Sequence, residues 1–104
     1  MSLERIIKIL ENFGFKRIEA EVYVYLAKRG PMKAKDLAKA LKIRSPELNL
    51  ILESLQAKGT VTVIHDNQVV FKAVAFEKTF DRLVNDNIEQ VKTIKNSWKN
   101  FESS

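Results

Sequence analysis

The sequence contains no cysteine and a single histidine, His65, among its 104 residues. The missing thiols exclude a disulfide framework, a thiolate metal site and a cysteine nucleophile. One histidine leaves almost nothing from which to build a histidine metal site or a His–Asp catalytic pair, so we expect no metal and no cofactor. Gly-rich phosphate loops, paired-carboxylate sites and nucleophile elbows are also missing, and we therefore expect that the protein is not an enzyme.

Long apolar runs are missing too, so no membrane-spanning helix and no membrane partner are expected. The first residues, Met1-Ser2-Leu3-Glu4-Arg5, lack the apolar stretch and cleavage site of a signal peptide. What is present is an ordinary globular composition, 45% hydrophobic and 30% charged, with a net charge of +5. The length suits one domain, and the basic balance favours an acidic partner such as nucleic acid.

Three glycines, at positions 14, 30 and 59, fall where helical patterns stop, as glycines that end helices do. An amphipathic pattern predicts a first helix that ends at Gly14 and a second helix at 17–29. The residues expected to form the inward stripe of the second helix are Ile18, Val22, Tyr25 and Leu26, widened by Tyr23 and Val24.

Two shorter helices are predicted at 34–41 and 46–57, joined by a break of about three residues. Ser45 is expected to cap the second of them, and Pro46 fits its first turn. Two short helices joined by a tight turn with an apolar plug, Ile43, are typical of a helix-turn-helix.

From Thr60 the pattern becomes that of strands. Residues 60–64 and 69–74 are rich in β-branched and aromatic side chains and flank a polar stretch at 65–68, which predicts a β-hairpin. Asp66 and Asn67 tolerate the left-handed backbone that such a turn needs. The loop holds two or three residues. We favour the odd length, which places Val61 and Val63 on the same face as Phe71 and Ala73.

The apolar pattern of residues 76–101 predicts one long helix of about 39 Å. It carries an apolar stripe in which Asn87 fills one position and Phe80 and Leu83 thicken the side near the domain. The helix is too long to bury this stripe against residues 1–75, so a second copy of the chain is expected to cover it, in parallel or antiparallel orientation. The predicted dimer interface is Val84, Ile88, Val91, Ile94, Trp98 and Phe101.

This order of elements is a mostly α fold with a β-hairpin, a winged helix-turn-helix with a long C-terminal dimerisation helix. Residues 1–75 would form the winged helix-turn-helix DNA-binding domain and residues 76–104 the dimerisation helix. Short runs over about residues 10–80 then resemble, in their order and spacing, the opening of the archaeal TrmB-like transcriptional regulators. These runs are Gly14-Phe15, Glu19-Ala20-Glu21-Val22-Tyr23, Gly30-Pro31, Ala34-Lys35-Asp36-Leu37-Ala38, Leu52-Glu53-Ser54-Leu55-Gln56-Ala57-Lys58-Gly59 and Phe71-Lys72-Ala73-Val74.

The resemblance implies sequence-specific binding of double-stranded DNA by a homodimer, with helix 46–57 in the major groove and the 60–74 hairpin as the wing. Larger members carry a sugar-binding domain, so at 104 residues this chain is similar to the short, single-domain members, and its effector is unknown. The sequence departs from the family where lysines, Lys16 and Lys33, replace Ser or Thr caps. It also departs where Ser45-Pro46-Glu47-Leu48-Asn49-Leu50 replaces a basic or aromatic start of the recognition helix, and in a wing tip without arginine.

Positive charge is concentrated between Lys28 and Arg44, where seven basic residues and one acidic residue give a net +6. In a winged helix this stretch includes the helix that crosses the phosphate backbone. Asn49 and Glu47 are permitted partners for adenine and for cytosine N4. The predicted DNA-binding residues are Lys33, Lys35, Lys39, Lys42, Arg44, Ser45, Glu47, Asn49 and Lys72. A solvated lysine-rich face is the alternative interpretation of the same lysines.

The sequence thus predicts a cytoplasmic, nucleoid-associated transcriptional regulator whose partners are double-stranded DNA and a second copy of the chain. The alternative is a winged-helix protein–protein interaction module in a transcription or membrane-remodelling assembly, without direct DNA binding. The carboxylates on helix 46–57, the outward Leu50 and the arginine-free wing favour this alternative.

Overall fold

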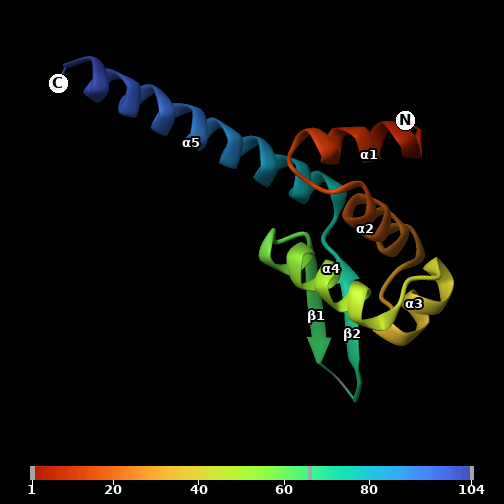
Figure 1. Ribbon diagram of the computed structural model, residues 1–104. Coiled ribbons are helices and arrows are strands. Elements are labelled where there is room, and N and C mark those ends of the chain that lie inside the picture. The colour runs from red at the N-terminus through yellow and green to blue at the C-terminus, as the bar shows by residue number, and fades with distance from the viewer. Residues whose placement is uncertain (1, 66, 104) are drawn as a thin grey trace.

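The computed structural model describes residues 2–65 and 67–103. The predictions for Met1 and for Asp66 in the hairpin turn therefore lie outside the described residues. The elements in chain order are α1 (Leu3–Asn12), α2 (Arg17–Arg29), α3 (Ala34–Leu41), α4 (Ser45–Ala57), β1 (Val61–His65), β2 (Val69–Ala73) and α5 (Phe76–Ser103). Figure 1 shows a body built from α1 to β2, from which α5 projects far to one side. The predicted fold class, mostly helical with a β-hairpin and a long C-terminal helix, is confirmed.

The bounds of α2 match the prediction, and its two ends show why. At its start, the Lys16 N–H donates to Glu19 Oε1 (2.8 Å), so a side chain three residues on replaces the missing Ser or Thr cap. At its end, Gly30 has φ +93° and ψ −177°, a backbone conformation that is essentially restricted to glycine. Local chemistry therefore fixes both ends of this helix.

The inward face of α2 was predicted only in part. Val22, Tyr23, Val24 and Leu26 are buried and Tyr25 is half-buried, but Ile18 is 40% exposed. The expectation for Ile18 was wrong because α2 is covered by α1, by α4 and by β2. The buried face of α2 is therefore broader than one stripe, and in the first turns it includes Glu19 and Ala20.

The helix-turn-helix comprises α3 and α4, with a left-handed residue, Lys42 (φ 56°), in the turn. Ile43 packs against the core, as predicted for the apolar plug. The expected cap at Ser45 was wrong by one residue: Arg44 precedes the helix in an extended conformation, and Ser45 is its first residue. The reason is that the Arg44 carbonyl already accepts the first helical hydrogen bond, from the Leu48 N–H (2.9 Å).

The hairpin pairs β1 and β2 antiparallel with Val61 opposite Ala73 and Val63 opposite Phe71. This register confirms the three-residue loop that we favoured. The α2–α3 connection adds an isolated antiparallel bridge to β2, since Met32 and Phe71 exchange both backbone hydrogen bonds (3.0 and 2.8 Å). Sequence analysis did not predict this bridge, which ties the base of the wing to the start of the helix-turn-helix.

The core lies between α1, α2, α3, α4 and the base of the hairpin, and its buried apolar side chains are Ile7, Leu10, Phe15, Ala20, Val22, Tyr23, Val24, Leu26, Leu37, Ala38, Leu48, Leu52, Leu55 and Val61. Tyr23 is the largest of the fully buried side chains, and burial raises its pKa. Its hydroxyl donates to the Val74 carbonyl (2.6 Å) and lies 3.3 Å from the buried Thr79 hydroxyl. One side chain of α2 thereby fixes the end of the wing and the first turn of α5.

Helix α5 is anchored at its start and uncovered beyond it. Phe80 stacks on Phe76 and meets Phe13, which directly follows α1, edge-on, with centroid distances of 5.9 and 6.0 Å. Leu83 is the last side chain of α5 that packs against the core, and every described residue from 85 onward is exposed. Among the described helices, none combines the length and the apolar character that a membrane crossing requires.

Candidate nucleic-acid interface

The predicted phosphate-contacting cations lie close together on α3 and its two flanking turns. Lys33 directly precedes α3, and Lys35 and Lys39 are four residues apart on it. Lys42 and Arg44 occupy the turn to α4. All five side chains are exposed, and none of them has an ion-pair partner among the described residues. These cations therefore face solvent without internal neutralisation.

The spacing of these cations follows the helix. Lys35 and Lys39 are four residues apart on α3, the spacing of one helix face, and Lys42 directly follows the helix in a left-handed conformation. The opposite face of α3 is held in place by Leu37 and Ala38, which are buried in the core. The position of this face is therefore set by packing.

The outer face of α4 carries a different chemistry. Ser45, Glu47, Asn49 and Glu53 are exposed, and Leu50 is 68% exposed near the middle of the helix. No lysine or arginine occurs from Ser45 to Ala57. The arrangement offers an amide, carboxylates and an apolar side chain, flanked on the N-terminal side by the cations of α3 and the turn.

The wing contributes one predicted residue. Lys72 is exposed on β2, opposite Thr62 of β1, while its neighbour Phe71 packs against the core. Alternation along the strand thus directs Lys72 away from the core. His65 is exposed at the last position of β1, next to the loop.

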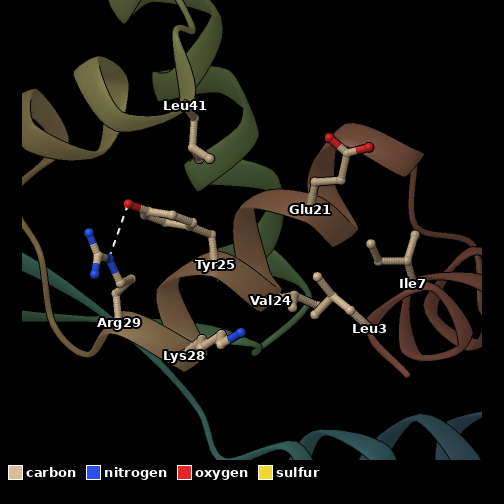
Figure 2. A pocket seen from close by; sticks show the side chains of 8 residues that line it. All are labelled: Leu3, Ile7, Glu21, Val24, Tyr25, Lys28, Arg29 and Leu41. Atoms are coloured by element: carbon tan, nitrogen blue, oxygen red, sulfur yellow. Dashed lines mark hydrogen bonds between the residues drawn. The ribbon is translucent and has the colours of Figure 1, made fainter. Parts of the chain in front are cut away.

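Two basic residues of the segment, Lys28 and Arg29, lie at the end of α2 instead, beside a hollow of about 380 Å³ between α1, α2 and α3. Figure 2 shows Arg29 turned toward Tyr25 of the same helix, across from Leu41. The Arg29 Nε donates to the Tyr25 hydroxyl (3.2 Å), and the guanidinium lies 5.6 Å from the ring centroid. These contacts hold Arg29 along α2, apart from the cations of α3.

A buried polar network that sequence analysis missed fixes α4 against the start of α2. Glu19 is only 4% exposed, and its Oε2 lies 3.6 Å from Lys58 Nζ, which donates to Ser54 Oγ (3.0 Å). Burial opposes ionisation of Glu19, but hydrogen bonds from Ser54 and the Lys16 N–H, together with the Lys58 charge, lower its pKa. Lys58 also lies over the Phe15 ring, at 5.5 Å. The network therefore sets the position of the C-terminal half of α4.

The predicted dimer residues lie along one side of α5. Val84 is half-buried, whereas Ile88, Val91, Ile94, Trp98 and Phe101 are exposed, Ile94 by 66% and Trp98 by 59%. The Trp98 and Phe101 rings stack at a centroid distance of 5.5 Å near the free end. A contiguous apolar stripe that is exposed along a helix is typical of an interaction surface.

The chain is similar to known proteins in both sequence and fold. The sequence profile of one family, described as "Sugar-specific transcriptional regulator TrmB", matches residues 10–77. The chain is 29% identical over 96 residues to the HTH-type sugar sensing transcriptional regulator TrmBL1 of Pyrococcus furiosus, a match that covers 92% of this chain and 28% of the relative. The chain thus spans little more than a quarter of that relative's length.

Solved structures show the same fold. TrmBL2, described as an archaeal chromatin protein with a novel mode of DNA binding, has a TM-score of 0.87 at 23% identity, over 98% of this chain and 41% of that one. ST1889 from the archaeon Sulfolobus tokodaii has a TM-score of 0.71 at 17% identity, over 88% of this chain and 99% of that one. The family and the curated relative are transcriptional regulators and not enzymes, as predicted.

Proposed function

Since the chain belongs to the TrmB family of sugar-specific transcriptional regulators, we propose that it binds double-stranded DNA as a homodimer and regulates transcription through that contact. In this proposal α4 enters the major groove and the hairpin at 60–74 lies along the adjacent backbone as the wing. Residues 1–75 bind DNA, and residues 76–104 form the dimer. The description of one structural neighbour as a chromatin protein supports a location on the chromosome.

The observation that carries the proposal is the group of five exposed cations without internal partners on α3 and its flanking turns. We assign phosphate contacts to Lys33, Lys35, Lys39, Lys42 and Arg44, with Ser45 beside them. A lysine or arginine that neutralises a phosphate releases a condensed counterion, which is the main source of non-specific affinity. The free first-turn amides of α3 add a partial positive charge at the same place.

Base contacts are assigned to the outer face of α4. Asn49 suits the paired acceptor and donor of adenine, and Glu47 suits the N4 amino group of cytosine. The absence of lysine and arginine from Ser45 to Ala57 fits a helix that faces base edges, while its flanks face phosphates. Lys72 would contact the backbone from the wing.

Dimerisation is assigned to the apolar stripe of α5: Val84, Ile88, Val91, Ile94, Trp98 and Phe101. The stripe begins where α5 leaves the body, so the winged domain of the same chain does not cover it. A second copy brings an identical stripe, and closed two-fold pairing is the commonest way in which such a surface is buried.

The test is fluorescence anisotropy of a labelled mixed-sequence duplex with a triple variant, Lys35→Ala, Lys39→Ala and Arg44→Ala. If each of the five cations neutralises one phosphate, together they contribute about −4.5 per bound domain to the slope of log K against log salt, and in the variant this contribution falls to about −1.8. The control removes the same charge elsewhere, with Arg5→Ala, Lys8→Ala and Lys28→Ala at exposed positions of α1 and α2, and should keep the parent slope. Equal slopes in the two variants would contradict the assignment.

A second candidate function is supported by a specific observation on α4. Leu50 and the exposed Ile18 line a hollow of about 430 Å³ between α4 and the start of α2, with Glu47 on its edge. The apolar side chains of this hollow, bordered by Glu47 and by Lys16 and Lys58, suit a docked protein segment that carries both apolar and charged groups. Leu50→Lys separates the two functions: it would abolish docking of a protein segment, whereas it would preserve or raise non-specific DNA affinity.

A further inference from the structure

From the distribution of side chains along α5, we infer that the two α5 helices of the dimer pair antiparallel, with the free end of each helix lying against the base of its partner's α5. The inference rests on the proposed homodimer and goes beyond it, since neither the seven-residue pattern nor the fold fixes an orientation.

The side chains along the stripe differ in size from one end of α5 to the other. The positions follow one another by alternating steps of three and four: Val84, Asn87, Val91, Ile94, Trp98 and Phe101. They grow from small side chains at the base of α5 to large aromatic ones at its free end. The distance between packed helices depends on the side chains at the contact, from about 8 to 10 Å.

Parallel pairing would place small side chains opposite small ones at the base, and Trp98 opposite Trp98 at the free end. The two helices would then have to splay apart toward the free end. In antiparallel pairing Val84 comes level with the partner's Phe101, Asn87 with the partner's Trp98, and Val91 with the partner's Ile94. Each layer then combines a smaller and a larger residue, so the interhelix distance stays even and the packing is close throughout.

Charge is also unevenly distributed along α5. In the uncovered part of α5 the acidic residues Asp86 and Glu89 come first, and the basic residues Lys92, Lys95 and Lys99 follow, with Glu102 near the end. The half at 85–91 therefore carries a net −2 and the half at 92–103 a net +2. Antiparallel pairing sets unlike halves side by side, within about one Debye length at 0.1 M salt, and parallel pairing sets like halves side by side.

The surface at the base of α5 also favours antiparallel pairing. A hollow of about 520 Å³ lies there between the end of α1 and α5, lined by Phe13, Leu83, Asn87 and Gln90 among others. Asn87 belongs both to this hollow and to the stripe. Antiparallel pairing brings the partner's large Trp98 to the level of Asn87, at the mouth of the hollow, whereas parallel pairing brings only the partner's smaller Asn87 to that level.

This arrangement has a consequence for DNA binding. The Val84 levels of the two protomers would be about 26 Å apart along the paired helices, at 1.5 Å per residue. The two winged domains then lie at opposite ends of the pair and do not touch. The spacing between half-sites is accordingly set by the length of α5.

The experiment is a double electron–electron resonance measurement on two spin-labelled variants, Thr93→Cys and Asn100→Cys, each in the full chain. The sequence has no cysteine of its own, and the two positions are one heptad apart, on the same side of α5. Antiparallel pairing places the two labels of a dimer about 2 Å apart along the axis at position 93 and about 22 Å apart at position 100. We expect the label distance at 100 to exceed that at 93 by about 10 Å or more.

Equal distances at the two positions, in protein that sediments as a dimer, would show parallel pairing and overturn the inference while the proposed dimer stands. Unlabelled chain that sediments as a monomer at every concentration tested would instead overturn the dimer itself, and the inference with it.

Discussion

Glu19 provides a test of how α4 is held in place, through the substitution Glu19→Gln. The glutamine keeps an acceptor for the Lys16 N–H (2.8 Å) but removes the charge that lies 3.6 Å from Lys58 Nζ. Loss of a buried charge-assisted contact of this kind costs about 1 kcal/mol. The entropy of unfolding is about 2.1 cal/mol/K per residue, so for 104 residues 1 kcal/mol lowers Tm by about 5 °C.

The difference in Tm between the parent and the Glu19→Gln variant should become smaller as the pH falls. The pKa of Glu19 is lowered in the folded protein. Its contribution to the free energy of unfolding is therefore complete above the unfolded pKa of about 4.3 and is lost as the pH falls through the lower, folded pKa. We expect the Tm of parent and variant to differ at pH 7 and this difference to shrink as the pH falls below about 4.3.

The assay is circular dichroism melting of both proteins at pH 7 and at pH 3, with Glu21→Gln as the matched control. Glu21 lies two residues away on α2, in a largely exposed ion pair with Arg17 (2.9 Å), and should change stability by less than about 0.5 kcal/mol. A parent-like Tm for Glu19→Gln at pH 7, or a difference that persists unchanged at pH 3, would refute this account of the network.

Three further substitutions test other contacts. Tyr23→Phe leaves the Val74 carbonyl without its hydrogen bond and should cost about 1 to 2 kcal/mol in a denaturant titration, whereas an unchanged midpoint would show that this hydrogen bond does not anchor the wing. Trp98→Asp should give a monomer by light scattering while Asn96→Asp stays dimeric, and an unchanged mass would remove Trp98 from the interface. Gly30→Ala should lower the free energy of unfolding by about 1 to 3 kcal/mol in the same titration. The cause is backbone strain alone, since an added Cβ meets nothing within 4 Å. An unchanged free energy of unfolding would refute this explanation.

Much of the fold is predictable because its signals are local. Glycines 14, 30 and 59 all have positive φ, so the residues that end helical patterns in the sequence are also those that end or follow helices in space. The hairpin register follows from alternation, since only the odd loop puts Val61 and Phe71 on one face. The length of α5 follows from an apolar pattern that no glycine or proline interrupts.

What the sequence did not reveal depends on contacts between distant segments. The Met32–Phe71 bridge joins residues 39 positions apart, and no local pattern marks it. Ile18 fits a helical stripe but lies outside the faces of α2 that α1, α4 and β2 cover. Helix α4 begins at Ser45, one residue before the predicted start at Pro46, because the hydrogen bond to the Arg44 carbonyl depends on the conformation of the turn.

The candidate site was likewise predicted only in part. The charge pattern of the sequence identified the cations of α3, but it also included Arg29, which the structure holds against Tyr25. Glu19 was missed although one signal was available: it stands three residues after Lys16, the spacing at which a glutamate caps a helix start. Its second partner, Lys58, is 39 positions away and could be found only in the folded chain.

The central claim, that the cations of α3 and its turns hold DNA, is tested most directly by anisotropy of a labelled mixed-sequence duplex with the unmodified chain at roughly 50 and 200 mM salt. The account predicts binding at the lower salt and a loss of affinity on the order of several hundred-fold per bound domain at the higher one. Absence of binding at 50 mM salt, or an affinity that does not change between the two, would contradict it.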